Sequence, residues 1–550
     1  MNWFLKNKNW FLLIVFLLLN WLILRPILRS DTFFLPHDST WLVRLHQFDK
    51  AVSLGQFPPR LAPDMAYGYG YPIFKYYAPL FTLLSWLVFK LIGDYALSVT
   101  LVVFLANLVG SWGMFLLGKR LYGFWGGLVS SAAFIFLPFR ALDIYVRGAF
   151  AEILAINLLP FWLYFFILLS AKKFNKKALV GFILISAGLI LSHNLYLLVL
   201  ACFLPLWLIY FFSSGGFSWK KKILILIGAA FLVLLITAWF WLPLVIGLKD
   251  VGALEQAGKT SFLDHFVYPK QLWNWPWGFA GSAPGLADGM SFKLGKAHIL
   301  LALAGVILIF LNKKSSRLLW LFLGVCLGGL FLALPWSISF WRTMPLLSTI
   351  QFPWRFLGLS APILALLSGG VVLIGKSFFF VRIRKLSVLT ALLAVFLFSF
   401  FNFKYFAPQK IVLSAQKNLL DREVIYRSSQ AVAEYYPAAV IFRPEEKPDW
   451  PLAFSGQQTA QVVAETPFKI IFRLNDPGQI NINRFYFPGW QLFLENKPVS
   501  INPEPAIGRI QFEAEEKGEY RLSFVTTPWE KIAYVLTVLG VIILIIVTIF

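Results

Sequence analysis

The chain has 550 residues, of which 59% are hydrophobic and 14% are charged, and its mean hydropathy is +0.72. Soluble proteins carry about 25% charged residues, so this composition excludes an ordinary soluble protein. A net charge of +23 is also seen in nucleic-acid-binding proteins. Here, however, the Lys and Arg residues gather in short loops between apolar segments, as the positive-inside rule describes. We therefore expect a polytopic helical membrane protein that binds no nucleic acid.

Apolar stretches long enough to cross about 30 Å of hydrocarbon recur along the chain. Placing the basic loops in the cytoplasm predicts twelve spans with both termini inside, at 9–28, 96–118, 123–139, 150–170, 178–192, 195–212, 223–247, 297–311, 318–334, 355–375, 386–402 and 530–550. The apolar stretch 76–93 is left over. We expect it to lie along or dip into the outer leaflet, and a thirteenth ordinary span is the alternative.

Residues 403–528 form one large polar region, in which apolar and polar residues alternate, as in "QININRFYF". Turn signals such as "NDPG" and "ENKP" separate these runs, which is typical of short antiparallel strands. The sequence thus predicts three parts. They are a transmembrane domain over 1–402, a mostly β, sandwich-like extracytoplasmic domain over 403–528 and a final membrane helix over 529–550.

The acidic residues are one-sided. All 11 Asp and Glu residues before residue 403 fall in predicted outer loops or at the outer ends of spans. Arginines, histidines and many aromatic residues share those loops. Such a surface suits a substrate with a phosphate, sugar hydroxyls and an apolar tail, because cations hold phosphate and carboxylates bind hydroxyls or accept their protons.

Four stretches carry a family resemblance: "HDSTWLVRLHQFDKAVSLGQFPPRLAPDMAYGYGYPIFKYYAPL", "YVRGAFAE", "IQFPWRF" and "FYFPGWQLFLENKPV". With them the chain resembles the GT-C superfamily of polytopic membrane glycosyltransferases. More narrowly, it resembles the prokaryotic membrane proteins labelled 6-pyruvoyl-tetrahydropterin synthase-related. The resemblance implies transfer of a sugar, with inversion, from a polyprenyl-phosphate-linked donor to an extracytoplasmic glycan, lipid or protein acceptor. The expected location is the cell membrane.

The resemblance also implies roles for particular residues. Asp38, just after the first span, is expected to be the catalytic base. The second acid is expected at Glu152 or, failing it, Asp143. The donor phosphate is expected to contact Lys75, and we add Arg147 and Arg355 to that set. Further candidate substrate contacts are His37, His46, Tyr71, His193, Asn194 and Glu434. No cofactor is fixed, and a divalent metal, Mg²⁺ or Mn²⁺, is left open.

Two other functions stay open at this point. One is a transporter or flippase of a lipid-linked saccharide, which is expected to place ionisable residues at mid-membrane. The other is a non-catalytic membrane protein that binds glycans. Structural roles are also open, since Asp38 can cap a helix and Arg147 or Arg355 can anchor at the interface. The acids at the outer surface favour the enzyme.

Overall fold

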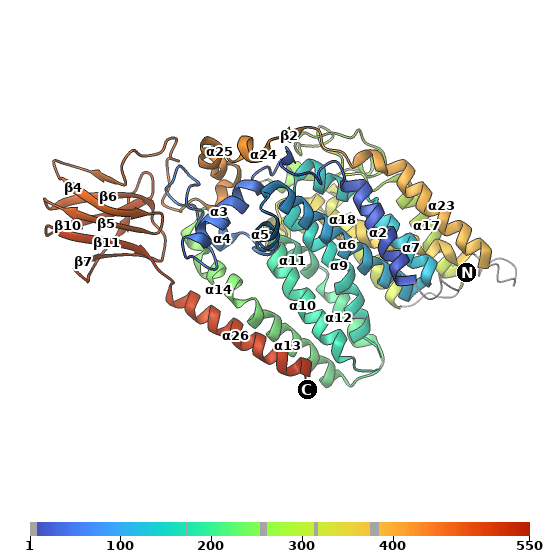
Figure 1. Cartoon of the computed structure of the whole chain (residues 1–550). Helices are drawn as coiled ribbons and strands as arrows, with labels where there is room; N and C mark the ends of the chain where they lie inside the picture. The colour runs from blue at the N-terminus through green and yellow to red at the C-terminus, as the bar shows by residue number, and fades with distance from the viewer. Residues whose placement is uncertain (1–7, 172, 254–260, 313–316, 375–383, 550) are drawn as a thin grey trace.

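The computed structural model describes residues 8–171, 173–253, 261–312, 317–374 and 384–549. Some members of the predicted basic clusters lie outside the described residues, namely Lys6, Lys172, Lys313, Lys314, Lys376 and Arg382, as does Glu255. Figure 1 shows a helical body with stacked β-strands at one end, and the last helix, α26 (Pro528–Ile549), running back from the strands along that body.

Six helical segments of the described chain are long and apolar enough to cross a membrane, or nine if each of three bent pairs forms one span. The six are α6 (Tyr95–Tyr122), α7 with its continuation (Phe124–Arg147), α9 (Phe150–Leu169), Pro353–Leu373, Lys385–Tyr405 within and just beyond α23 (Arg384–Asn402), and α26. The bent pairs are α11 (Asn194–Ala201) with α12 (Leu204–Ser213), α13 (Trp219–Ile236) with α14 (Ala238–Gly247), and α18 (Arg317–Ala333) with Pro335–Thr343. Further helices are α2 (Lys8–Leu24), α10 (Lys176–Ser192) and α17 (Lys296–Leu311). These helices confirm the polytopic helical class.

Within the apolar stretch 76–93, which was not assigned to a span, Leu80–Ile92 form α5, a helix of 13 residues. At 1.5 Å per residue it is about 20 Å long, shorter than the hydrocarbon core. It packs against α6 and against α3 (Trp41–Ser53), the helix of the first long loop. Its length favours a segment that does not cross, and its place in the bilayer stays a prediction.

The C-terminal strands form two antiparallel sheets that share one core, as the alternating pattern predicts. One sheet has the order β3 (Leu452–Phe454), β6 (Gly478–Phe485), β10 (Arg509–Ala514) and β9 (Asn502–Pro503). The other has β4 (Ala460–Thr466), β5 (Lys469–Leu474), β11 (Gly518–Phe524), β7 (Trp490–Leu494) and β8 (Lys497–Val499). Phe472 pairs with Tyr520 across β5 and β11, and both rings meet Phe512 of the facing sheet.

The region between α23 and β3 is mostly not β, unlike the expectation for 403–528. It holds α24 (Ala415–Leu419), α25 (Arg422–Arg427) and the 3₁₀ segment η8 (Ser428–Tyr435). One short strand, β2 (Ile411–Leu413), pairs with β1 (Thr32–Phe34) right after the first helix. This pairing brings the start of the chain beside the segment that precedes the sheets.

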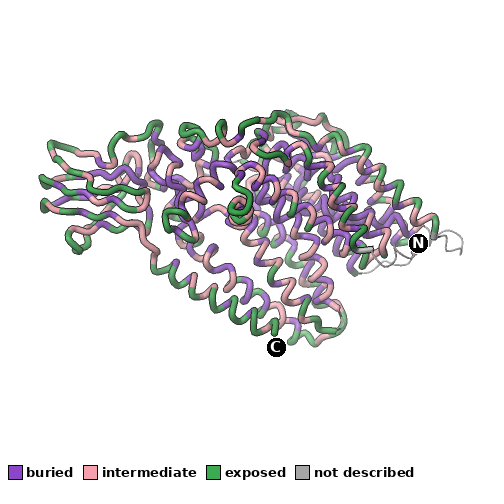
Figure 2. The backbone as a smooth tube through the Cα atoms, in the orientation of Figure 1, coloured by how far each residue is buried: buried purple, intermediate pink, exposed green. Residues whose placement is uncertain are grey.

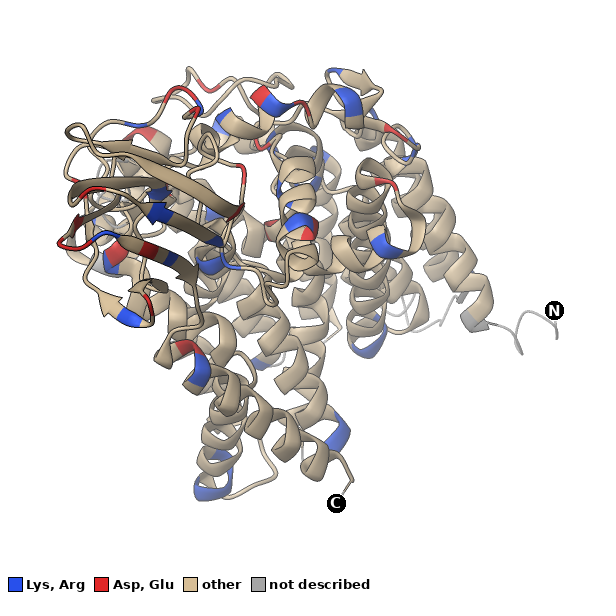
Figure 3. Ribbon diagram, turned by 60° about the vertical axis from the view of Figure 1, so that its left-hand side comes forward, with Lys and Arg blue, Asp and Glu red and all other residues tan. Residues whose placement is uncertain are grey.

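Burial and charge both follow the membrane pattern. Helices α7 and α9 are largely buried, whereas much of α23 and α26 is exposed (Figure 2). The exposed residues of these two helices include Phe396 and Ile542. In Figure 3 the Asp and Glu positions gather toward the sheets and the upper loops, and the lower ends of the helices show Lys and Arg positions. The distribution agrees with the one-sided acids of the sequence.

Candidate functional site

A polar pocket of about 600 Å³ lies where the first loop, the start of α9, the turn before α11, the segment before α21 (Leu357–Ser368) and η8 meet. It brings together eight of the residues singled out from the sequence: His37, Asp38, Arg147, Glu152, His193, Asn194, Arg355 and Glu434. We refer to it as the polar pocket. It joins segments that are hundreds of residues apart in the chain.

Asp38 is held by its own loop and by the loop that carries Arg147. Its Oδ1 accepts hydrogen bonds from Arg44 Nη2 at 3.0 Å and from Thr40 Oγ1 at 2.9 Å. Its backbone N–H donates to the Arg147 carbonyl at 2.9 Å. No side chain caps the N-terminus of α3, so Asp38 does not serve as that helix's cap. The carboxylate faces the pocket with Oδ2 free of any hydrogen bond from the described residues.

The two loops approach each other closely at Gly148. Trp41 Nε1 donates to the Gly148 carbonyl at 2.7 Å. Gly148 has φ +66°, and a Cβ there would lie 2.5 Å from Pro36 Cγ. Only glycine accepts this backbone and this contact without strain. The approach fixes Asp38 relative to Arg147.

Arg44 is a site residue that the sequence analysis missed. Its side chain is 1% exposed and lies between the rings of Trp41 and Tyr77, at 4.6 and 4.4 Å. Burial alone would lower its pKa, but Asp38 together with Tyr77 and Tyr435 outweighs burial, and the pKa is raised. The guanidinium therefore stays charged. Its place six residues after Asp38, in the helix that Asp38 was considered able to cap, was the available signal.

Arg147 pairs with both acids of its own loop. It hydrogen-bonds Asp143, and its Nη2 lies 2.8 Å from Glu152 Oε2. Its guanidinium also lies 4.3 Å from the ring centre of Trp354. Glu152 lines the polar pocket, whereas Asp143 is fully buried behind Arg147 and does not. Of the two candidates for the second acid, Glu152 is thus the one at the pocket.

Arg355 differs from Arg44 and Arg147 because no carboxylate among the described residues lies within ion-pair distance of it. Its Nη1 donates to the Ile350 carbonyl at 2.5 Å and to Gln351 Oε1 at 3.4 Å. Its Nε is buried without a partner in the described chain. The side chain is half-buried and lines the polar pocket, so its guanidinium can be reached from there. Arg355 is therefore suited to bind an anion that enters the pocket.

The imidazoles at the pocket have defined partners. His193 Nδ1 accepts from the backbone N–H of Tyr196 at 3.1 Å, which caps α11. Burial lowers the pKa of His193 to about 4, against the opposing effect of Glu152, so the ring is neutral at neutral pH. His37 Nε2 lies 2.8 Å from the Phe279 carbonyl. Asn194 donates to the Tyr76 carbonyl at 3.4 Å.

Besides Asp143, three predicted site residues do not line the polar pocket. The Lys75 ammonium lies beside Gly247 and the ring of Tyr76, away from the polar pocket. Burial lowers its pKa. This position does not support the expected contact between Lys75 and the donor phosphate. His46 packs on Tyr95 and contacts Gln47. Tyr71 instead braces η8. Its hydroxyl donates to the Val432 carbonyl and accepts from the Tyr435 N–H.

The carboxylates do not form an evident metal site. Within the described ranges, no group of three or more His, Cys, Asp or Glu residues is placed to hold a metal ion. Asp38 and Glu152 already contact guanidinium groups, so these donors do not fit a divalent cation as placed.

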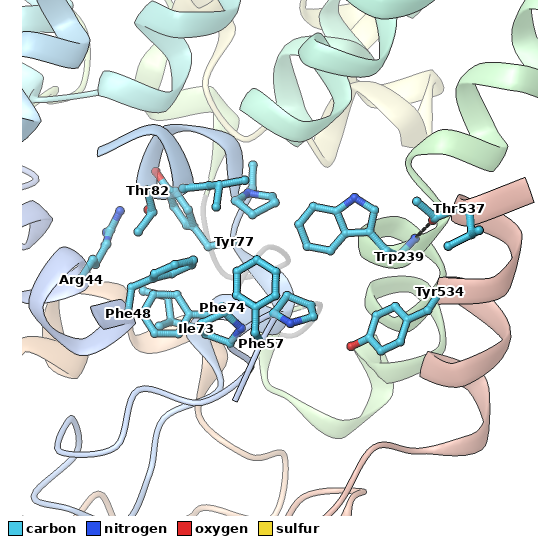
Figure 4. Close-up of a pocket in the computed structure, with 16 residues that line it drawn as sticks. Arg44, Phe48, Phe57, Ile73, Phe74, Tyr77, Thr82, Trp239, Tyr534 and Thr537 are labelled. Carbon is cyan, nitrogen blue, oxygen red and sulfur yellow. Dashed lines mark hydrogen bonds between the residues drawn. The ribbon is translucent and has the colours of Figure 1, made fainter. Parts of the chain in front are cut away.

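A second, apolar pocket of about 250 Å³ adjoins the first and shares Arg44, Tyr77 and Ala78 with it. We refer to it as the apolar pocket. Figure 4 shows Phe48, Phe57 and Phe74 on one side of it and Trp239 and Tyr534 on the other. The Trp239 backbone N–H donates to Thr537 Oγ1 at 2.9 Å, which joins α14 to α26 across its rim. A polar and an apolar compartment thus lie side by side.

Fold and site together define a polytopic membrane protein with a charged pocket beside an apolar one and a C-terminal pair of β-sheets. Residues 74–406 match the family described as "6-pyruvoyl-tetrahydropterin synthase related domain; membrane protein". This is more than half of the chain, and the chain belongs to that family.

Three further comparisons give more distant likenesses. An uncharacterized protein of Lactococcus lactis subsp. cremoris (strain MG1363) is 26% identical over 260 residues, which is 44% of this chain and 41% of that protein. The arabinofuranosyltransferase AftD from Mycobacteria is 14% identical, with a TM-score of 0.46 over 72% of this chain and 27% of AftD. ArnT from Cupriavidus metallidurans, bound to undecaprenyl phosphate, is 12% identical, with a TM-score of 0.41 over 78% of each chain. The match thus spans less than half of the Lactococcus protein and of AftD.

Proposed function

We propose that this protein is a membrane glycosyltransferase that moves a sugar from a polyprenyl-phosphate-linked donor to an acceptor hydroxyl. The observation that carries the proposal is Arg355. This half-buried guanidinium has no carboxylate within ion-pair distance among the described residues and faces a pocket that also holds Asp38 and Glu434. An anion fits the cation, hydroxyls fit the carboxylates, and an apolar tail fits the neighbouring apolar pocket.

The donor phosphate is assigned to Arg355 and to the exposed edge of Arg147. A guanidinium presents several N–H donors in a planar fork that matches phosphate oxygens. Arg147 already shares its charge between Asp143 and Glu152, so Arg355 carries most of the attraction. As the sugar leaves, charge grows on the phosphate, and a cation held beside it stabilises the transition state.

The acceptor proton is assigned to Asp38. The acceptor oxygen forms a bond to the anomeric carbon on the face opposite the phosphate, the bond from that carbon to the phosphate oxygen breaks, and Asp38 Oδ2 takes the hydroxyl proton. Arg44 and Thr40 hold Oδ1, which orients the carboxylate. The products are an inverted glycoside and the polyprenyl phosphate.

The lipid tail is assigned to the apolar pocket. Arg44 and Tyr77 line both compartments, so a ligand with its charged group near Arg355 can continue into the apolar side. Each buried CH₂ contributes about 0.8 kcal/mol, so even a few isoprene units stabilise the complex appreciably. We place the pocket and the sheets on the extracytoplasmic side, because the basic loops lie at the opposite ends of the helices.

The test is a direct comparison of wild-type protein and Asp38→Asn. Cells that lack the protein, and cells that carry either form, are compared by mass spectrometry of envelope glycans. A sugar that is present with wild type and lost with Asp38→Asn supports the proposal. Reconstituted vesicles distinguish transport from transfer. Donor that crosses the bilayer without releasing free polyprenyl phosphate would refute the transferase and favour a flippase.

A further inference from the structure

Glu434 reaches the polar pocket from a segment that the sequence placed in a separate domain. It lies in η8, which bends at Val432 with φ −134° and ψ 48°. Two tyrosines fix this bend. Tyr71 bonds the Val432 carbonyl and the Tyr435 N–H, and the ring of Tyr76 stacks on Tyr435 at 5.9 Å and 10°. Glu434 is thus presented by a braced backbone.

The Glu434 carboxylate lacks the partners that the other pocket acids have. Asp38 is paired with Arg44 and Glu152 with Arg147. In the described chain no side chain donates a hydrogen bond to Glu434 or forms an ion pair with it. Burial raises its pKa and Asp38 adds to this, while its own backbone N–H, Arg44 and Arg355 act against the shift. Glu434 is half-buried at the wall of the polar pocket, so its carboxylate is open to hydrogen bonds from a ligand there.

The surroundings select the kind of ligand. A phosphate is repelled by a carboxylate and fits Arg355 instead. An ammonium group would meet the charges of Arg44 and Arg355, which both influence Glu434. A neutral group with several O–H donors fits best, and the sugar of the proposed donor carries such groups.

We propose that Glu434 is a specificity-determining residue that accepts hydrogen bonds from hydroxyl groups of the donor's sugar. This rests on the proposed function and adds a subsite to it. The phosphate lies toward Arg355, the sugar toward η8, and the tail in the apolar pocket. The segment between the membrane helices and the sheets thereby takes part in substrate choice.

The test measures binding of two lipids to purified full-length protein. The probes are undecaprenyl phosphate and the same lipid carrying a neutral hexose or a pentose. Glu434→Ala is expected to lower the affinity for the preferred sugar-bearing lipid by about tenfold or more, the loss typical of a hydrogen bond to a charged group. Binding of undecaprenyl phosphate should change by less than about twofold, since the variant leaves the phosphate contacts intact. Glu434→Gln keeps an acceptor oxygen, so its affinity for the sugar-bearing lipid should lie between those of wild type and Glu434→Ala.

Glu446→Gln is the matched control, because Glu446 is exposed on the same connecting segment and does not line the polar pocket. It should bind both lipids as wild type does. If Glu434→Ala lowers the affinity for both lipids equally, or for neither, the sugar subsite is refuted while the assignment of the phosphate to Arg355 stands. Wild-type protein that binds neither lipid would overturn the proposed function and the subsite with it.

Discussion

Replacing Arg355 by Ala should separate ligand binding from stability. The guanidinium has one backbone partner and one long contact to Gln351, while Nε lacks a partner in the described chain. A phosphate that meets the free edge makes charge-assisted hydrogen bonds worth about 1.5–3 kcal/mol. Arg355→Ala should therefore weaken undecaprenyl phosphate binding by about 10- to 150-fold. Arg355→Lys keeps the charge but loses the planar set of N–H donors, so its affinity should lie between those of wild type and Arg355→Ala.

Stability should not fall in parallel. Arg355 is half-buried and forms no ion pair among the described residues, so removing it relieves part of a desolvation cost, and the thermal unfolding temperature of Arg355→Ala should stay close to that of wild type. Binding is measured by titrating the lipid against protein in nanodiscs, and unfolding is followed on the same samples. Arg342→Ala is the control, since Arg342 is exposed on the preceding helix segment. Unchanged affinity in Arg355→Ala, or equal losses in both variants, would refute the assignment.

Three other predictions address the base, the last helix and the topology. Asp38→Asn should lower turnover by about 10²- to 10⁴-fold while undecaprenyl phosphate still binds, and near-normal turnover would move the base elsewhere. Glu530→Gln breaks the buried ion pair with Arg60, in which Nη1 and Oε2 are 2.7 Å apart, and should lower the free energy of unfolding by about 3–5 kcal/mol. Lys531 is exposed, so Lys531→Gln should change the free energy of unfolding little. Gly215→Cys should resist an impermeant maleimide in intact cells and Gly281→Cys should react, both sites having open space around a Cβ, and the reverse pattern would reject the threading.

The residues that the sequence could place are those whose position follows from one helix. Arg147 and Glu152 lie at the end and the start of two apolar helices joined by a short turn, so their shared location was predictable. Lys75 was harder, because it lies on α4 (Ile73–Tyr76), a single turn whose direction no periodicity fixes. Its place before an apolar helix therefore gave no reliable side-chain orientation.

Other features depend on contacts between distant segments. Asp38 pairs with Arg44. This pairing depends on how α3 is turned about its own axis, and the hydrogen bond from Trp41 to the Gly148 carbonyl of the facing loop holds that orientation. Glu434 was recognised as a candidate, but its route into the pocket follows from the pairing of 32–34 with 411–413. Alternation within a strand predicts the strand and leaves its distant neighbours open.

The apolar pocket is walled on one side by Tyr534, Thr537 and Val538 of α26, which the ribosome makes after every other described element. A chain still being inserted holds Asp38 and Arg355 long before this wall exists. Such a copy would have the charged groups of the polar pocket but not this wall of the apolar pocket. Under the proposed function, a lipid tail would be enclosed only after α26 has packed against α14. A variant truncated before Pro528 is therefore expected to lack the enclosed lipid site.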